Sequence, residues 1–192
     1  MAVRSEESRR SILEATMRLL EDSGPNGFTV QKLSIERIAR EAGVSKTTIY
    51  RWWSSKVAVV IDTFLDNHVA RTPVRQDIPA IDALREHMSS LAEVYAGNEG
   101  RLVAQLIGEC QQDGSAMAEF KKHFWLPRAE AVRSLVERAI SEGALRRDLD
   151  VQVVTELLYS PLYFRLLFQS GPLDANAAGA VMQTVLQGLA VE

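Results

Sequence analysis

Basic and hydroxyl-bearing side chains are concentrated between Ser45 and Lys56 of this 192-residue chain. Lysine and arginine neutralise phosphate groups, and an arginine can also form two hydrogen bonds with the edge of a guanine. Serine, threonine and tyrosine hydroxyls donate hydrogen bonds to phosphate oxygens. This chemistry predicts contact with double-stranded DNA through Ser45, Lys46, Thr47, Thr48, Tyr50, Arg51 and Lys56, and Trp52 should lie on or near the same outer side.

The charge of the chain is divided unevenly along its length. The whole sequence has 22 Lys and Arg against 25 Asp and Glu, a net charge of -3. Residues 1–60 carry 10 basic and 7 acidic side chains, whereas residues 61–192 carry 12 and 18. Residues 37–56 hold five basic side chains against Glu41 alone. We therefore expect a small basic head on a larger acidic body, which makes a DNA partner compatible with the acidic whole.

Two short helices joined by a tight turn should present these side chains. Ser34 is a plausible N-cap for a helix that ends near Ala42, and Gly43 permits the left-handed backbone of a turn. Ser45 can cap the next helix, to Trp52, and Ser54 a third, to about Ala70. Their inner face would be formed by Ile35, Ile38, Ala39, Val44 and Ile49. This layout is that of a helix-turn-helix.

The order of residues in this segment resembles the TetR family of transcriptional regulators. The matching positions are Ile38, Ala39, Ala42, Gly43, Val44, Ser45, Thr48, Ile49, Tyr50, Trp53 and Lys56. The resemblance implies that Tyr50, Trp52 and Lys56 contact phosphates and that Trp53 anchors the core. It implies that the major groove is read by Lys46, Thr47, Thr48 and Arg51.

Three positions depart from the family pattern, and the strong match covers only about the first third of the chain. Trp52 stands where histidine is frequent, Trp53 where phenylalanine is frequent, and Val57 where an acidic residue is frequent. The first departure bears on the phosphate contact expected of Trp52. By the same resemblance, Arg4 and Arg9 at the start of the first helix could also reach phosphates.

Apolar residues recur at helical spacing in nearly every segment, so the predicted fold is all-α with about nine helices. The cluster from Gly24 to Gly27 should end the first helix. We expect a helix-turn-helix domain over 1–72 and a helical ligand-binding and dimerisation domain over 73–192. The body helices are predicted near 80–96, 99–112, 115–142, 151–170 and 175–190. Pro127 and Pro161 should kink or divide the helices that contain them.

The last two predicted helices are unusually apolar, and the span 175–191 has no charged side chain. Such helices are normally buried on several sides, which favours a four-helix contact between two copies of the chain. The dimer residues expected there are Leu158, Leu162, Val181, Met182, Val185 and Leu189. The alternative is that both helices complete the core of one subunit. The family resemblance also implies a homodimer.

Apolar and aromatic residues of the body, mixed with polar ones, could line a pocket for an unidentified small-molecule effector. The expected pocket residues are Met88, Leu91, Tyr95, Gln105, Leu106, Cys110, His123, Phe124, Trp125, Tyr159 and Tyr163. Residues of these types at helical spacing are more often plain core, and that reading stays open.

Catalytic and metal sites are not expected. His68, His87 and His123 are scattered, and Cys110 has no evident base partner. We interpret Glu109 beside it as part of a solvated face, and we expect no cofactor. A lone cysteine, no signal peptide and no membrane-spanning segment favour a cytoplasmic protein.

The sequence therefore predicts a homodimeric regulator, most simply a repressor, that binds a palindromic operator and responds to a mostly apolar ligand. The competing interpretation is a helical carrier or protein-interaction module that does not bind DNA.

Overall fold

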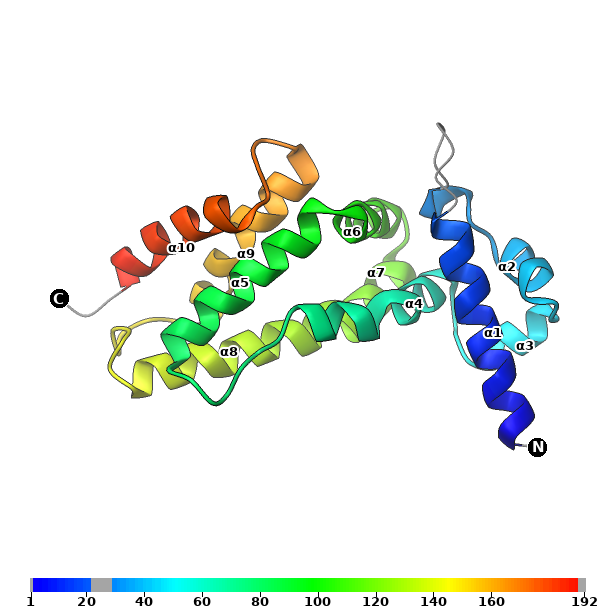
Figure 1. The fold of residues 1–192 in the computed structure, drawn as a ribbon, viewed down its shortest axis with the longest axis horizontal. Coiled ribbons are helices and arrows are strands. Elements are labelled where there is room, and N and C mark those ends of the chain that lie inside the picture. Colours follow the sequence, from blue (N-terminus) through cyan, green and yellow to red (C-terminus); the bar gives the residue numbers. More distant parts are fainter. Residues whose placement is uncertain (1, 22–28, 190–192) are drawn as a thin grey trace. The chain divides into compact units, whose positions relative to one another are not determined.

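The structure of the protein is a computed structural model that describes residues 2–21 and 29–189, with side chains from residue 6 onward. This part of the chain is helical and contains no β-strand, which confirms the all-α prediction (Figure 1). The helices are α1 (Ala2–Glu21), α2 (Ile35–Ala42), α3 (Lys46–Tyr50), α4 (Lys56–Arg71), α5 (Ala80–Ala96), α6 (Asn98–Cys110), α7 (Gly114–Phe120), α8 (Leu126–Ser141), α9 (Val151–Phe168) and α10 (Ala175–Leu189). A 3₁₀ turn (Val30–Lys32) precedes α2, and a π-helical segment (Lys121–Trp125) joins α7 to α8. The predicted stop at Gly24 to Gly27 and the helix end at Ala190 lie outside the described residues.

None of the helices described is long and apolar enough to cross a membrane.

The chain forms two compact units that are not simple halves of the sequence. The first unit combines Met1–Asn67 with Leu102–Trp125, and the second combines His68–Arg101 with Leu126–Glu192. Both α4 and α6 therefore contribute residues to each unit. The compact units do not follow the boundary expected after residue 72, because residues 102–125 belong to the same unit as the N-terminal segment. The division by function at that boundary stays a prediction.

The helix-turn-helix of the first unit forms for the local reasons that the sequence predicts. The Ser34 hydroxyl accepts a hydrogen bond from the Arg37 backbone N–H at 3.2 Å and so caps α2. Gly43 adopts φ 66°, a left-handed conformation that favours glycine, and its backbone N–H closes the C-terminus of α2. The Ser11 hydroxyl of α1 donates to the Ala42 carbonyl at 3.2 Å, which holds α1 against this turn.

Two predicted helix ends in this unit were wrong. α3 ends at Tyr50, and the chain then tightens into a turn in which the Trp52 N–H donates to the Ile49 carbonyl three residues back, at 2.9 Å. Ser55 rather than Ser54 caps α4, since its hydroxyl accepts the Ala58 N–H at 3.1 Å.

In the second unit, α5 packs against α8, α9 and α10 (Figure 1). The long helix predicted over 115–142 is divided into α7, the π-helical segment and α8. Pro127 lies in the first turn of α8, where its missing N–H is tolerated, which explains why the division falls just before it. α9 instead runs through Pro161 as one helix, and Asp150 caps it through the N–H groups of Gln152 and Val153.

Candidate nucleic-acid interface

The outer face of α3 is the first candidate surface. Ile49 is completely buried and fixes the rotation of this short helix against the rest of the unit. With Ile49 inward, the exposed residues are Lys46, Thr47, Tyr50 and Arg51. Tyr50 is 55% exposed, so its ring and hydroxyl are open to solvent. Cationic and hydroxyl groups thus project together from one side of α3.

Ser45 and Thr48 are committed to local hydrogen bonds. The Ser45 hydroxyl accepts from the Thr48 N–H at 3.1 Å and lies 2.9 Å from the Thr48 hydroxyl. These contacts form the N-cap of α3 and leave each hydroxyl only part of its capacity for another partner.

Trp52 is placed differently from its expected role as a phosphate contact. Its indole N–H is buried, with no hydrogen-bond partner among the described residues, so in this structure it is not available to a phosphate. The ring lies in the turn after α3, with its centroid 6.3 Å from that of Trp53.

Lys46 is held by a carboxylate of the preceding helix. Its Nζ donates to Glu36 Oε1 at 2.8 Å, and both side chains are more than half exposed. The hydrogen bond and the charge of Lys46 lower the pKa of Glu36, and Glu36 raises the pKa of Lys46. An exposed pair of this kind is weak and easily exchanged, so Lys46 remains a usable DNA contact.

Lys56 also has an acidic partner, and here the two side chains are mostly covered. Its Nζ donates to Glu109 Oε1 of α6, within the first unit. The side chains of Lys56 and Glu109 are 19% and 29% exposed. The interpretation of Glu109 as part of a solvated face was therefore wrong, and the ammonium group of Lys56 that was expected to contact a phosphate is bound to a carboxylate.

A brace beneath α3 joins α1 to α4. Arg9 Nη2 donates to Asp62 Oδ2 at 2.6 Å, and the Trp53 indole N–H donates to the same oxygen at 3.1 Å. The Arg9 guanidinium also lies 6.0 Å from the centre of the Trp53 ring. Trp53 is nearly buried, in agreement with its expected role as an anchor, whereas Arg9 is engaged inside the unit. The side chain of Arg4 lies outside the described residues.

The expected pocket residues are divided between the two units. Met88, Leu91, Tyr95, Tyr159 and Tyr163 belong to the second. The first contains the remaining six, Gln105, Leu106, Cys110, His123, Phe124 and Trp125. In the first unit the buried Phe124 ring contacts Phe64 and Phe120, at centroid distances of 5.6 and 5.2 Å. Whether the two sets share a ligand stays a prediction.

Two polar residues of the expected pocket, Gln105 and His123, have other partners. The Gln105 side-chain oxygen accepts the Val30 backbone N–H at 3.0 Å, which ties the 3₁₀ turn to α6. His123 is exposed and pairs with Glu119 at 3.3 Å. It lines a cleft of about 220 Å³ together with Trp52, Trp53 and Asp62. Long-range packing, which sequence spacing does not reveal, accounts for both placements.

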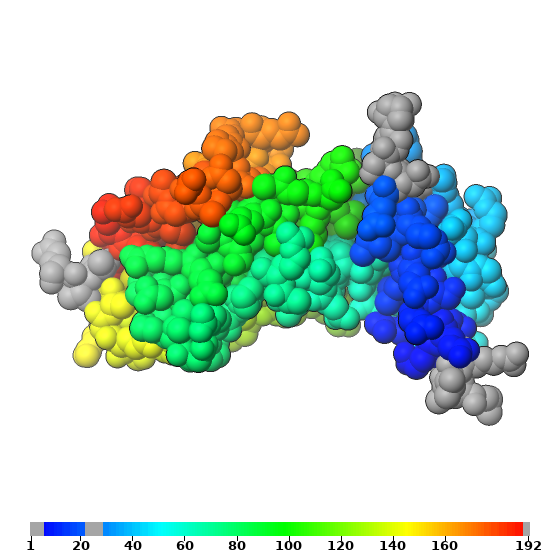
Figure 2. Space-filling view, viewed as in Figure 1, coloured from blue at the N-terminus to red at the C-terminus, as the bar shows by residue number. Residues whose placement is uncertain are grey.

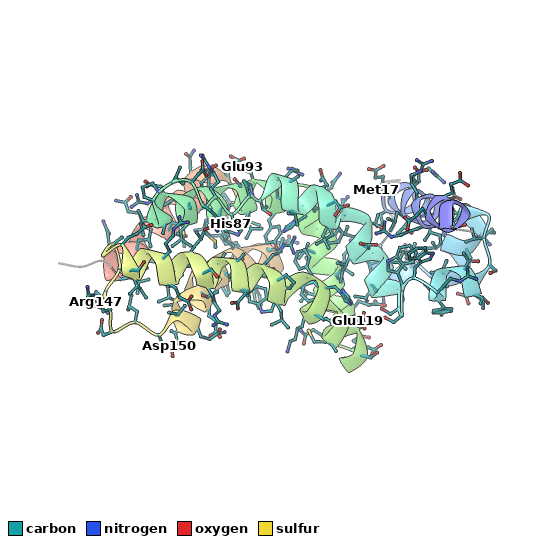
Figure 3. All side chains as sticks on the ribbon, turned by 90° about the horizontal axis from the view of Figure 1, so that it is seen from below. Met17, His87, Glu93, Glu119, Arg147 and Asp150 are labelled. Atoms are coloured by element: carbon teal, nitrogen blue, oxygen red, sulfur yellow. The ribbon has the colours of Figure 1, made fainter. Side chains whose placement is uncertain are left out.

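A buried polar cluster lies within the second unit. The hydroxyls of Tyr95 and Tyr163 are 3.0 Å apart, and His87 Nδ1 lies 3.1 Å from the Pro73 carbonyl. His87 points inward from α5, whereas Glu93 on the same helix points outward (Figure 3). Burial lowers the pKa of His87 to about 4, so its imidazole is neutral and Nδ1–H donates to Pro73. Burial raises the pKa of Tyr163 to about 12.

The same unit buries a histidine–carboxylate pair. His68 Nδ1 contacts Glu99, and Arg71 lies 3.5 Å from the other oxygen of that carboxylate. Burial lowers the pKa of His68 despite the nearby carboxylate. The tyrosine and histidine rings, the Glu99 carboxylate and Arg71 give the second unit polar groups that could orient a ligand.

The side chains expected at the dimer interface lie mainly in the core of one subunit. Leu158, Leu162, Met182 and Leu189 are buried by contacts within the second unit, and only Val181 and Val185 are partly exposed. The stripe identified from the sequence therefore faces inward, because α9 and α10 use it to pack on α5 and α8.

A second apolar stripe of α9 remains uncovered. Its exposed members are Val153, Leu157, Phe164, Leu167 and Phe168. Phe168 is 70% exposed, with its ring centroid 5.0 Å from that of Phe164. Figure 2 shows that α10, drawn in red, also reaches the outer surface of its unit. These residues belong to the apolar helix that was expected at a contact between two copies, although Leu158 and Leu162 were the α9 residues selected for that contact.

Sequence reasoning missed Glu36 and Asp62 and assigned Glu109 a different role. Each pairs with a basic residue of the helix-turn-helix or of α1. The partners are 10 to 53 positions apart in the sequence, so no local spacing could have identified them.

Comparison with known proteins gives matches along nearly the whole chain. Residues 12–63 match the family described as bacterial regulatory proteins, tetR family, and residues 80–185 match the tetracyclin repressor-like C-terminal domain. An uncharacterised HTH-type transcriptional regulator of Bacillus subtilis, YdeS, is 33% identical over 97% of this chain and 91% of its own.

Solved structures share the fold. The TetR family transcription regulator SCO0332 superposes with a TM-score of 0.78 at 27% identity, covering 96% of this chain and 100% of its own. The Thermus thermophilus repressor FadR, solved with lauroyl-CoA, has a TM-score of 0.70 at 24% identity, covering 96% of each chain.

Proposed function

This chain belongs to the TetR family of bacterial transcriptional regulators, and on that basis we propose that it is a homodimeric repressor that binds a palindromic operator. A small, mostly apolar molecule bound by the body would lower its affinity for the operator. We place this activity in the cytoplasm, because its reducing conditions suit a chain whose single cysteine is a buried free thiol.

The outward face of α3 is the observation that carries the proposal. Lys46, Thr47, Tyr50 and Arg51 are exposed together, while Ile49 holds the helix in place. A short helix of this kind fits the major groove of B-DNA. In a two-fold dimer the two copies of α3 would enter successive major grooves, about 34 to 36 Å apart or farther on a longer operator.

Arg51 should decide base preference. We expect Arg51→Ala to weaken binding to the selected operator about 10- to 100-fold and to change binding to random DNA much less, because a bidentate contact with guanine is sequence-specific. Selection of bound DNA from a random pool at fixed salt identifies the operator, and fluorescence anisotropy then compares both DNAs.

Arg85 provides the matched control, since it is an exposed arginine of the second unit paired with Asp82. Arg85→Ala should leave discrimination unchanged. Selection that recovers no preferred sequence, together with a flat response to salt, would favour the carrier or interaction protein instead.

The exposed stripe of α9 should form the dimer contact. We expect Phe168→Asp to convert the dimer to a monomer in sedimentation velocity, because the charge would be buried without a partner at the interface. Circular dichroism should show unchanged helicity, since Phe168 is exposed in the single subunit. A variant that remains dimeric, or a wild-type protein that is monomeric, would contradict this interface.

We expect the effector to bind near the buried polar cluster of the second unit. Lauroyl-CoA is a suitable first probe, because the similar Thermus repressor was solved with it. Its addition to the operator complex should release DNA, with a change in affinity of about 5- to 150-fold for a typical allosteric coupling. Separate additions of free fatty acid and of free coenzyme A show whether the apolar or the polar part of lauroyl-CoA causes the release of DNA.

A further inference from the structure

We propose that Glu109 competes with an operator phosphate for Lys56 and thereby sets the affinity of the protein for DNA. The proposal rests on the proposed function, because it concerns a residue of the same DNA-binding surface. Glu109 is a positioning residue in this scheme, since it acts on DNA only through Lys56.

The geometry gives Lys56 a single strong partner. Lys56 is the first residue of α4, and Glu109 is the penultimate residue of α6. Their contact joins Nζ to Oε1, and both side chains are mostly covered. The side chain of Lys56 is only 19% exposed, so a phosphate that binds its ammonium group would draw that group away from Glu109. In this scheme the phosphate contact forms at the expense of the ion pair.

The position of Glu109 makes its carboxylate dependent on Lys56. The C-terminus of a helix carries a partial negative charge, so an acidic residue in the last turn is unfavourable. The adjacent Cys110 is buried, and burial with the nearby charge of Glu109 raises the pKa of its thiol to about 11. Both observations describe an anionic site in which the Lys56 ammonium is the compensating charge.

The ion pair differs from the other pair of the DNA-binding surface. Lys46 and Glu36 are both exposed, and water can replace either partner at little cost. The Lys56–Glu109 pair is more covered, and its opening leaves Glu109 without its cation at a helix end. DNA binding must therefore include an unfavourable step at Lys56 that Glu109→Gln would remove.

The test measures the affinity of the full-length protein for its selected operator by anisotropy at several salt concentrations. Glu109→Gln should tighten binding about fivefold, the size expected for release of a modest ion pair. Lys56→Ala should weaken binding and reduce the salt slope by about 1, as expected for the loss of one phosphate contact. In the Lys56→Ala background, Glu109→Gln should have no further effect.

Glu119→Gln is the matched control. Glu119 lies in the same unit and pairs with His123, so its replacement removes the same charge without touching Lys56. We expect less than a twofold change for this variant. Equal tightening by Glu109→Gln and Glu119→Gln would overturn the proposal, because the effect would then come from net charge alone.

Two other outcomes would also overturn it. Glu109→Gln could leave affinity unchanged while Lys56→Ala lowers it, or Glu109→Gln could tighten binding equally with and without Lys56. Arg51→Ala tested on the same operator separates this proposal from the broader one. If Arg51 controls discrimination while the Lys56 and Glu109 variants behave as wild type, the protein is a DNA-binding regulator without this competition.

Discussion

Replacement of Gly100 by alanine is expected to lower the free energy of unfolding by about 3 kcal/mol. Gly100 is buried in the first turn of α6, just after the corner that follows α5. A Cβ at this position would lie 2.0 Å from the Tyr95 carbonyl oxygen and 2.6 Å from its carbonyl carbon. Because these atoms belong to the backbone, a rotamer change cannot relieve the clash, and the corner itself must move.

Gly108 on the same helix is the matched control for this measurement. It is exposed, and no atom lies within 4 Å of a Cβ built on it. Gly108→Ala should raise stability by about 0.5 to 1 kcal/mol, because alanine loses less backbone entropy in a helix. Urea unfolding followed by circular dichroism compares the two variants. Equal stabilities for Gly100→Ala and wild type would show that the α5–α6 corner adjusts freely.

Phe124→Ala should lower the free energy of unfolding by about 3 to 5 kcal/mol, because truncation of a buried phenyl ring leaves a cavity. Phe124 is fully buried, and its ring lies against Phe64 and Phe120. This packing favours the plain-core interpretation of Phe124, which was expected to line a ligand pocket. The loss should be the same with and without effector, as measured by thermal and urea unfolding.

Leu126 supplies the comparison, since it lies two residues further on and is 56% exposed. We expect Leu126→Ala to change stability by no more than about 0.5 kcal/mol. If Phe124→Ala were also this mild but weakened effector binding, Phe124 would be a pocket wall rather than a core residue.

The DNA-binding motif could be predicted because short-range chemistry determines it. The caps at Ser34 and Ser45, the left-handed Gly43 and the inward Ile49 all depend on neighbours within a few residues. The errors are also of only one or two residues. Ser55 caps α4 where Ser54 was predicted, and α3 ends two residues before the predicted end. Adjacent serines offer the backbone equivalent caps, and packing chooses between them.

Contacts between distant segments could not be predicted in the same way. Helical periodicity shows that α9 and α10 are apolar, but an all-round apolar helix does not reveal which stripe faces its own subunit. Leu158 and Leu162, which were expected at a dimer contact, are buried within one subunit, whereas Phe164 and Phe168 of the same apolar helix are exposed. Glu36 and Glu109, the partners of Lys46 and Lys56, were not predicted for a related reason, because glutamates on an amphipathic helix normally face water.

The shared helices α4 and α6 limit how this protein can be dissected. A fragment cut after residue 72 would keep the whole helix-turn-helix but lose Leu102–Trp125, which belong to the same compact unit. That fragment would lack the carboxylate that holds Lys56, the amide that holds the Val30 N–H and the ring that covers Phe64. The compact unit that carries the helix-turn-helix is thus discontinuous in sequence, and we expect a truncated head to bind its operator more weakly because it lacks this packing.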